Sequence, residues 1–246
     1  LFFCCISLFF ARNFSLAIVS FMNIVTVFCM FINLCILLHN KLDLIFKIAF
    51  IIGISVLVQT YLELNHFIGV AKSNSIVDAL AELKGNTGNI NIFAASLVGK
   101  IPFLLIGITY FSKWKRGLLV LSLFLASLLI FLTASRASYL GIFIEMIVFI
   151  VVYLKINIQK KPNYIYYVAI IIPLLIAFFT ANIIFEKGKD NTRYQSVTTR
   201  VLQIGSTKTE DASINARLTF WDNAVQIIKA NPVLGIGLGN WKIDAM

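Results

Sequence analysis

Two arginines have the chemistry and the setting to bind an anion at a membrane surface. Arg136 lies in the turn from Thr133 to Ser138, between two apolar runs, and Arg217 lies in the polar segment that ends the sequence. A guanidinium makes paired hydrogen bonds to phosphate oxygens and keeps its charge at any working pH. The pair predicts a clamp for a diphosphate at the level of the lipid headgroups. For Arg136, the alternative is a side chain that snorkels to the boundary and only fixes the turn.

Further polar residues follow the same pattern of turns between apolar runs. Asn89 and Asn91 lie in a turn-forming stretch, and either residue could cap the helix that follows. Arg200 adds positive charge upstream of Arg217, although a solvated surface role explains it equally simply. The glycines near the end could bring backbone N–H groups to a phosphate, but no strand precedes them. A dinucleotide-binding fold is therefore excluded, and turn flexibility is the favoured role for Gly235, Gly237 and Gly239.

Lys100 and Glu145 are the charges that lie deepest in the apolar runs. At a rise of ~1.5 Å per residue they lie ~15 and ~12 Å below the same membrane surface, so they could meet. An unpaired charge in hydrocarbon costs at least ~2.5–3.5 kcal/mol, which favours a buried ion pair between the two helices. The alternative is a proton or ion relay of the kind that transporters use.

The sequence gives no sign of a metal, a cofactor or a disulfide. His39 and His66 each stand alone, without a second ligand at metal-binding spacing. The four cysteines lie in apolar runs with no CxxC pair, where thiols behave as small hydrophobic groups. We therefore expect neither a zinc site nor a disulfide framework.

These residues must be held by a membrane protein. Hydrophobic residues make up 59% of the 246 residues and charged residues 13%, and the mean hydropathy is +0.90, outside the range of soluble domains. The net charge of +10 is spread in small basic groups between apolar runs, as membrane topology predicts, which argues against nucleic-acid binding.

The predicted fold is an all-α polytopic bundle, because a span needs about 20 mostly apolar residues and lipid-exposed backbone must satisfy its own hydrogen bonds. About six full spans follow a clipped apolar helix at residues 1–10; they are expected at 16–38, 42–64, 90–111, 117–135, 137–154 and 164–185. The basic groups at Lys113 to Arg116 and Lys155 to Lys161 place those turns in the cytoplasm by the positive-inside rule.

On this topology, two segments face outward: the loop at about residues 65–89 and the polar stretch 186–246. We expect residues 1–185 to form the membrane bundle and 186–246 to form an extracytoplasmic loop that is truncated at its C-terminal end. Leu218, Trp221, Val225 and Ile228 share one helical face, which predicts an amphipathic helix on the membrane surface or the top of the bundle.

The order of several motifs resembles the O-antigen ligase and polymerase superfamily. These are Gly88 to Ala94, then Thr133 to Arg136, then Arg217 with Trp221, then Asn231-Pro232 and the glycine-rich run to Trp241. Their combination is more specific than any one of them. The likeness covers roughly Gly85 to Trp241.

Members of this superfamily are metal-independent, multi-pass glycosyltransferases of the bacterial inner membrane, with the long loop facing the periplasm. They transfer or polymerise glycan from an undecaprenyl-diphosphate donor, and the acceptor is lipid A core or a second lipid-linked glycan. The resemblance implies that Arg136 and Arg217 contact the donor diphosphate and stabilise charge on the leaving group. It also implies accessory roles for Ser135, Asn89, Asn91, Trp221 and Arg200. It implies no cofactor.

The likeness has two departures. Ile90 stands where the family often has proline, and the general base that the family implies is a histidine beyond Met246. We therefore expect the chain as given to be inactive alone. The alternatives are a polytopic transporter or lipid-linked glycan flippase, and a non-catalytic membrane component that binds a partner near Trp221. Polar groups gathered in one external loop favour the enzyme, because flippases usually keep such groups inside the bundle.

Overall fold

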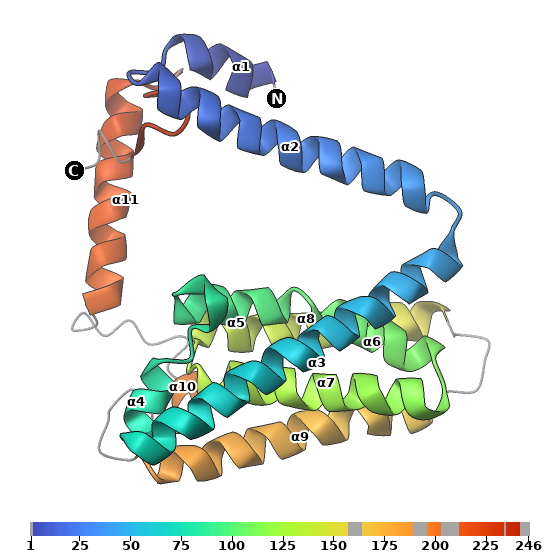
Figure 1. Cartoon of the computed structure of the whole chain (residues 1–246). Helices are drawn as coiled ribbons and strands as arrows, with labels where there is room; N and C mark the ends of the chain where they lie inside the picture. Colours follow the sequence, from blue (N-terminus) through green and yellow to red (C-terminus); the bar gives the residue numbers. More distant parts are fainter. Residues whose placement is uncertain (1, 157–163, 189–195, 203–211, 234, 242–246) are drawn as a thin grey trace. The chain divides into compact units, whose positions relative to one another are not determined.

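The computed structural model describes residues 2–156, 164–188, 196–202, 212–233 and 235–241, all as helices and turns, with no strand among them (Figure 1). The all-α prediction is confirmed. The chain divides into two compact units: unit 1 comprises Leu1–Lys41 and Thr207–Met246, and unit 2 comprises Leu42–Ser206. The predicted boundary near residue 185, between bundle and loop, stays a prediction. Lys160 and Lys161, which the sequence assigns to the cytoplasmic side, lie outside the described residues.

Each unit is built from helices in chain order. Unit 1 contains α1 (Phe2–Phe9), α2 (Phe14–Leu38) and α11 (Ala212–Ala230). Unit 2 contains α3 (Leu42–Ser73), α4 (Ile76–Ala81), the 3-10 turn η1 (Gly85–Thr87), α5 (Ile90–Val98), α6 (Ile101–Tyr110), α7 (Lys113–Leu132), α8 (Arg136–Ile156), α9 (Tyr164–Glu186) and α10 (Val197–Leu202).

The six expected spans are present. Among the described residues, six helices are long and apolar enough to cross a membrane: Phe14–Leu38, Leu42–Ser73, Ile90–Tyr110, Lys113–Leu132, Arg136–Lys155 and Ile165–Glu186. The second is longer than expected, because α3 continues through the polar residues Asn65 and His66. Phe67 in this extension is buried in the core of unit 2, so packing sustains the helix beyond its apolar run.

The third span is broken in the middle. α5 ends at Val98 and α6 begins at Ile101, with Gly99 and Lys100 between them and Pro102 in the first turn of α6. Proline is well placed there, because the first N–H groups of a helix have no partner within it. The break places the backbone around Lys100 inside the protein rather than against lipid, which is where a membrane protein tolerates such irregularity.

The helix α7 lies at the centre of unit 2 and packs against α3 and α9. Its inward face is fully buried at Leu119, Leu123 and Ala126. The close contact with α3 depends on Gly53, because a Cβ there would meet Leu119 Cδ2, and Ser122 Oγ donates to Gly53 O at 3.0 Å. Small residues at such contacts let membrane helices approach closely.

Candidate functional site

The turn that carries Arg136 is compact and internally hydrogen-bonded. Thr133 Oγ1 donates to Ile130 O at 2.7 Å, and Tyr139 Oη donates to Phe131 O at 2.5 Å. Ser138 Oγ donates to Ser135 Oγ at 3.0 Å, and Thr133, Ser135 and Ser138 are all buried. These bonds fix the turn between α7 and α8 from both sides.

Backbone strain adds to the definition of this turn. Ala134 has a φ of +53°, in the left-handed region that residues with a Cβ rarely adopt. Such a conformation persists only when the surrounding structure enforces it, as the hydroxyl contacts of Thr133, Ser135 and Ser138 do here. The turn therefore holds the next residue, Arg136, in a fixed position.

Arg136 is the first residue of α8 and is half-buried. The N-terminal end of a helix carries a partial positive charge from its unpaired N–H groups, which adds to the charge of a guanidinium placed there. This arrangement favours an anion at the start of α8. Arg136 also makes a contact within the protein, so an incoming anion would share or replace that contact.

Other predicted site residues lie on helices that pack against α8. Asn89 is the N-cap of α5, where its side chain accepts hydrogen bonds from the N–H groups of Asn91 and Ile92, so the predicted cap is confirmed for Asn89. Arg200 is half-buried on α10, and both α5 and α10 contact α8. Unit 2 therefore brings Ser135 and Arg136 together on one turn and sets α5 and α10 beside that helix.

The segment before α5 is held by charged residues from α3 and α4. Glu63 Oε1 accepts a hydrogen bond from the N–H of Gly85 at 2.9 Å, and His66 Nε2 lies 3.4 Å from Glu82 Oε2. The Gly85 contact fixes the start of the turn that leads to Asn89. His66 therefore has a carboxylate neighbour, which its isolated position in the sequence did not indicate.

Arg217 and Trp221 lie on α11 in unit 1, and both are exposed. The hydrophobic residues Leu218, Trp221, Val225 and Ile228 are also exposed. The helix that the sequence predicts is therefore confirmed, while its placement on a membrane surface stays a prediction. The convergence of Arg217 with Arg136 also stays a prediction, because the two residues belong to different units.

The glycine-rich loop after α11 has a structural role in unit 1. Gly235, Gly237 and Gly239 all have positive φ, at +65°, +85° and +74°. Asn240 is fully buried, and its Oδ1 accepts a hydrogen bond from the N–H of Asn13 at 2.9 Å. Sequence reasoning did not single out Asn240, because its partner lies 227 positions away and no local pattern indicates the contact.

The predicted ion pair between Lys100 and Glu145 is not formed. Lys100 Nζ instead donates to Gln59 Oε1 at 2.6 Å, and Glu145 Oε2 is buried without a hydrogen-bond partner among the described residues. The break between α5 and α6 places Lys100 in a turn and lets its side chain reach α3 rather than α8. Equal depth in the membrane was therefore insufficient to make the two residues partners.

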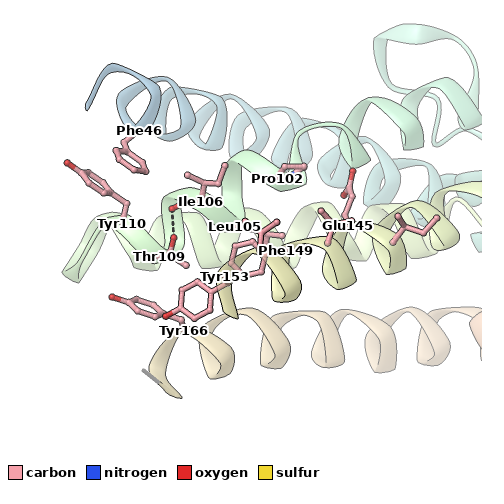
Figure 2. A pocket seen from close by; sticks show the side chains of 13 residues that line it. Phe46, Pro102, Leu105, Ile106, Thr109, Tyr110, Glu145, Phe149, Tyr153 and Tyr166 are labelled. Carbon is pink, nitrogen blue, oxygen red and sulfur yellow. Dashed lines mark hydrogen bonds between the residues drawn. The ribbon is translucent and has the colours of Figure 1, made fainter. Parts of the chain in front are cut away.

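Glu145 lines an apolar cavity of about 770 Å³ in unit 2, shown in Figure 2. Most of the cavity wall comes from α6 and α8, with Phe46 of α3 and Tyr166 of α9 completing it. Three tyrosines, Tyr110, Tyr153 and Tyr166, contribute to this wall. The cavity thus combines a lipid-like lining with one carboxylate.

Among the described residues, no group of three or more His, Cys, Asp or Glu side chains could hold a metal ion. The four cysteines, Cys4, Cys5, Cys29 and Cys35, are free thiols. The site is therefore described by its arginines, hydroxyls and helix ends.

Six membrane-length helices and a fixed arginine turn define a polytopic helical membrane protein. Residues 121–246 match the family model described as O-antigen ligase, and the chain belongs to this family. The matched region includes the turn of Arg136, the helix of Arg217 and the glycine-rich loop. No curated protein and no solved structure matches the chain. Family membership supports a ligase or polymerase role that uses a lipid-linked glycan donor and a glycan acceptor.

Proposed function

We propose that the chain is part of a glycosyltransferase that transfers or polymerises glycan from an undecaprenyl-diphosphate donor on the outer face of the bacterial cytoplasmic membrane. The observation that carries the proposal is the O-antigen ligase match, which covers both arginines. The acceptor is lipid A core in a ligase or a second lipid-linked glycan in a polymerase. The long loop then faces the periplasm.

In this proposal Arg136 binds the donor diphosphate at the start of α8. The buried hydroxyls of Thr133 and Ser135 hold the turn, so the guanidinium is oriented before the donor arrives. When the glycosidic bond to the diphosphate breaks, negative charge grows on the leaving phosphate oxygen. A guanidinium in place stabilises that charge without reorganisation, and a metal ion is not required.

Arg217 supplies a second positive charge to the same diphosphate. Its position on a helix of 19 residues makes it part of a stiff element rather than a loose loop. Arg200, Asn89, Asn91 and Trp221 are proposed as accessory residues around the donor and acceptor.

Replacing each arginine in the intact protein tests the proposal. In a strain that lacks the native gene, Arg136→Ala and Arg217→Ala should abolish the surface glycan ladder, because each removes charge from the leaving group. Lys72→Ala at the end of α3 and Lys229→Ala on α11 are matched controls, since both residues are exposed and basic, and both variants should keep the ladder. Unchanged ladders in both arginine variants would remove the assignment.

A transporter or flippase remains the second candidate, because unit 2 contains a broken span with Lys100 and Gln59 at the break. Discontinuous helices with polar groups near the midplane are typical of secondary transporters. The two functions differ in what accumulates. Loss of a transferase leaves lipid-linked glycan on the outer face, whereas loss of a flippase leaves it on the inner face.

A further inference from the structure

The glycine-rich loop packs closely on the beginning of α2, and the fit depends on two of its three glycines. A Cβ on Gly237 would meet the backbone of Ala11, and a Cβ on Gly239 would meet Ser20 Oγ and lie 3.0 Å from Leu16 O. A Cβ on Gly235 would meet nothing within 4 Å. Gly235 thus serves the turn, whereas Gly237 and Gly239 serve the approach of one backbone to another.

Asn240 completes this contact with a buried hydrogen bond. Its Oδ1 accepts from the N–H of Asn13 at 2.9 Å, and its Nδ2 donates to Leu238 O at 3.1 Å. Asn13 is itself the N-cap of α2 and accepts from the N–H of Leu16. The amide of Asn240 therefore links the loop to the cap of a membrane-length helix.

The same contacts argue against a phosphate site in this loop. A glycine loop that cradles phosphate leaves space beside its Cα atoms so that the ligand can approach the backbone. Here atoms of Ala11, Leu16 and Ser20 occupy that space beside Gly237 and Gly239. The loop is consequently an internal contact of unit 1.

We propose that residues 235–241 form an anchor that fixes the end of α11 to the start of α2, and that Asn240 is a positioning residue for Arg217. The loop follows α11 directly, and Gly235 N–H donates to Asn231 O just after the helix ends. Arg217 lies about 20 Å before that end along a stiff helix, so fixing the end restricts where Arg217 can be. The positioning role rests on the proposed function, in which Arg217 binds the diphosphate; the anchor itself does not.

A cysteine pair tests the anchor. In a variant with the four native cysteines replaced by serine, Gly239→Cys is combined with Ser20→Cys. The Cβ built on Gly239 lies 3.1 Å from Ser20 Cβ, so a small shift reaches the usual disulfide separation of about 3.8 Å. After mild oxidation, mass spectrometry should identify the linked peptides. If no linked peptide forms, the loop does not dock on α2 and the anchor is wrong.

The same pair separates anchoring from ligand binding. Gly239→Cys alone and the reduced pair should lose the surface glycan ladder, and the oxidised pair should recover it, because the disulfide replaces the lost contact. Gly235→Ala is the control for strain without a steric clash and should keep the ladder. A disulfide that forms without restoring the ladder would show that Gly239 serves something other than anchoring.

Substitutions at Asn240 test the positioning role. Asn240→Leu removes the acceptor for Asn13 N–H and should raise the KM for lipid-linked donor about tenfold with a smaller effect on kcat, since one hydrogen bond is worth roughly a factor of ten. Asn240→Asp keeps an oxygen acceptor and should restore most of the loss. The exposed Asn231→Leu is the matched control and should leave the KM unchanged.

Combining Asn240→Leu with Arg217→Ala distinguishes the failure of each idea. If Asn240 acts through Arg217, its substitution should add nothing to the KM of Arg217→Ala. An equal further increase in that background would overturn the positioning role. If Arg217→Ala itself leaves the KM unchanged, the proposed function fails while the disulfide result still decides the anchor.

Discussion

At the scale of single residues, the turn from Thr133 to Ser138 shows how local chemistry fixes one arginine. The sequence indicated a constrained turn, because two apolar runs are separated there by a few small polar residues. It did not indicate that Ala134 adopts a positive φ or that three hydroxyls become buried. Those features depend on how α7 and α8 pack, which no local pattern specifies.

Ala134 gives a direct test of this strain. Ala134→Gly should be neutral or slightly stabilising, because relief of the left-handed conformation, about 1–2 kcal/mol, exceeds the loss of one buried methyl, about 0.8 kcal/mol. Ala134→Val should destabilise, since a branched side chain is poorly tolerated at positive φ. Thermal unfolding in detergent measures both. Ala137→Gly, in the first turn of α8, is the control and should destabilise by up to ~1 kcal/mol.

At the scale of elements, the spans were predictable because crossing a membrane requires a fixed length of apolar residues. Depth along a helix was predictable for the same reason. The rotation of each helix about its axis was not, which is why Lys100 contacts Gln59 and Glu145 lines a cavity instead of the two forming a pair. The break at Gly99 and Lys100 was also missed, although Pro102 was a local signal for it.

The contact between α3 and α7 carries a testable requirement for a small residue. Gly53→Ala should destabilise the protein by about 1–3 kcal/mol, because the added Cβ enters the space of Leu119 and the core must shift. Gly69→Ala is the matched control on the same helix, where a Cβ meets nothing within 4 Å. It should be neutral or stabilising by up to ~1 kcal/mol. Equal effects on the unfolding temperature would contradict the packing described for α7.

At the scale of the whole molecule, family membership and charge distribution lead to one expected orientation. The turn at Lys113 to Arg116 should face the cytoplasm, and the turns near Asn86 and Arg136 should face outward. Single cysteines in a cysteine-free background test this. An impermeant thiol reagent applied to intact cells, with access through the cell wall or outer membrane, should label Asn86→Cys but not Ser112→Cys, both at exposed positions. The reverse labelling pattern would place Arg136 on the wrong side for the proposed reaction.

The central claim is that Arg136 and Arg217 hold the same diphosphate, and donor binding measures this most directly. Affinity for undecaprenyl diphosphate should be determined for the purified intact protein, both single alanine variants and the double variant. Each single substitution should weaken binding about 10- to 100-fold, the range for a hydrogen bond to a charged group, and the two effects should be non-additive because the residues share a ligand. Unchanged affinity in either single variant, or strictly additive losses, would contradict a shared site.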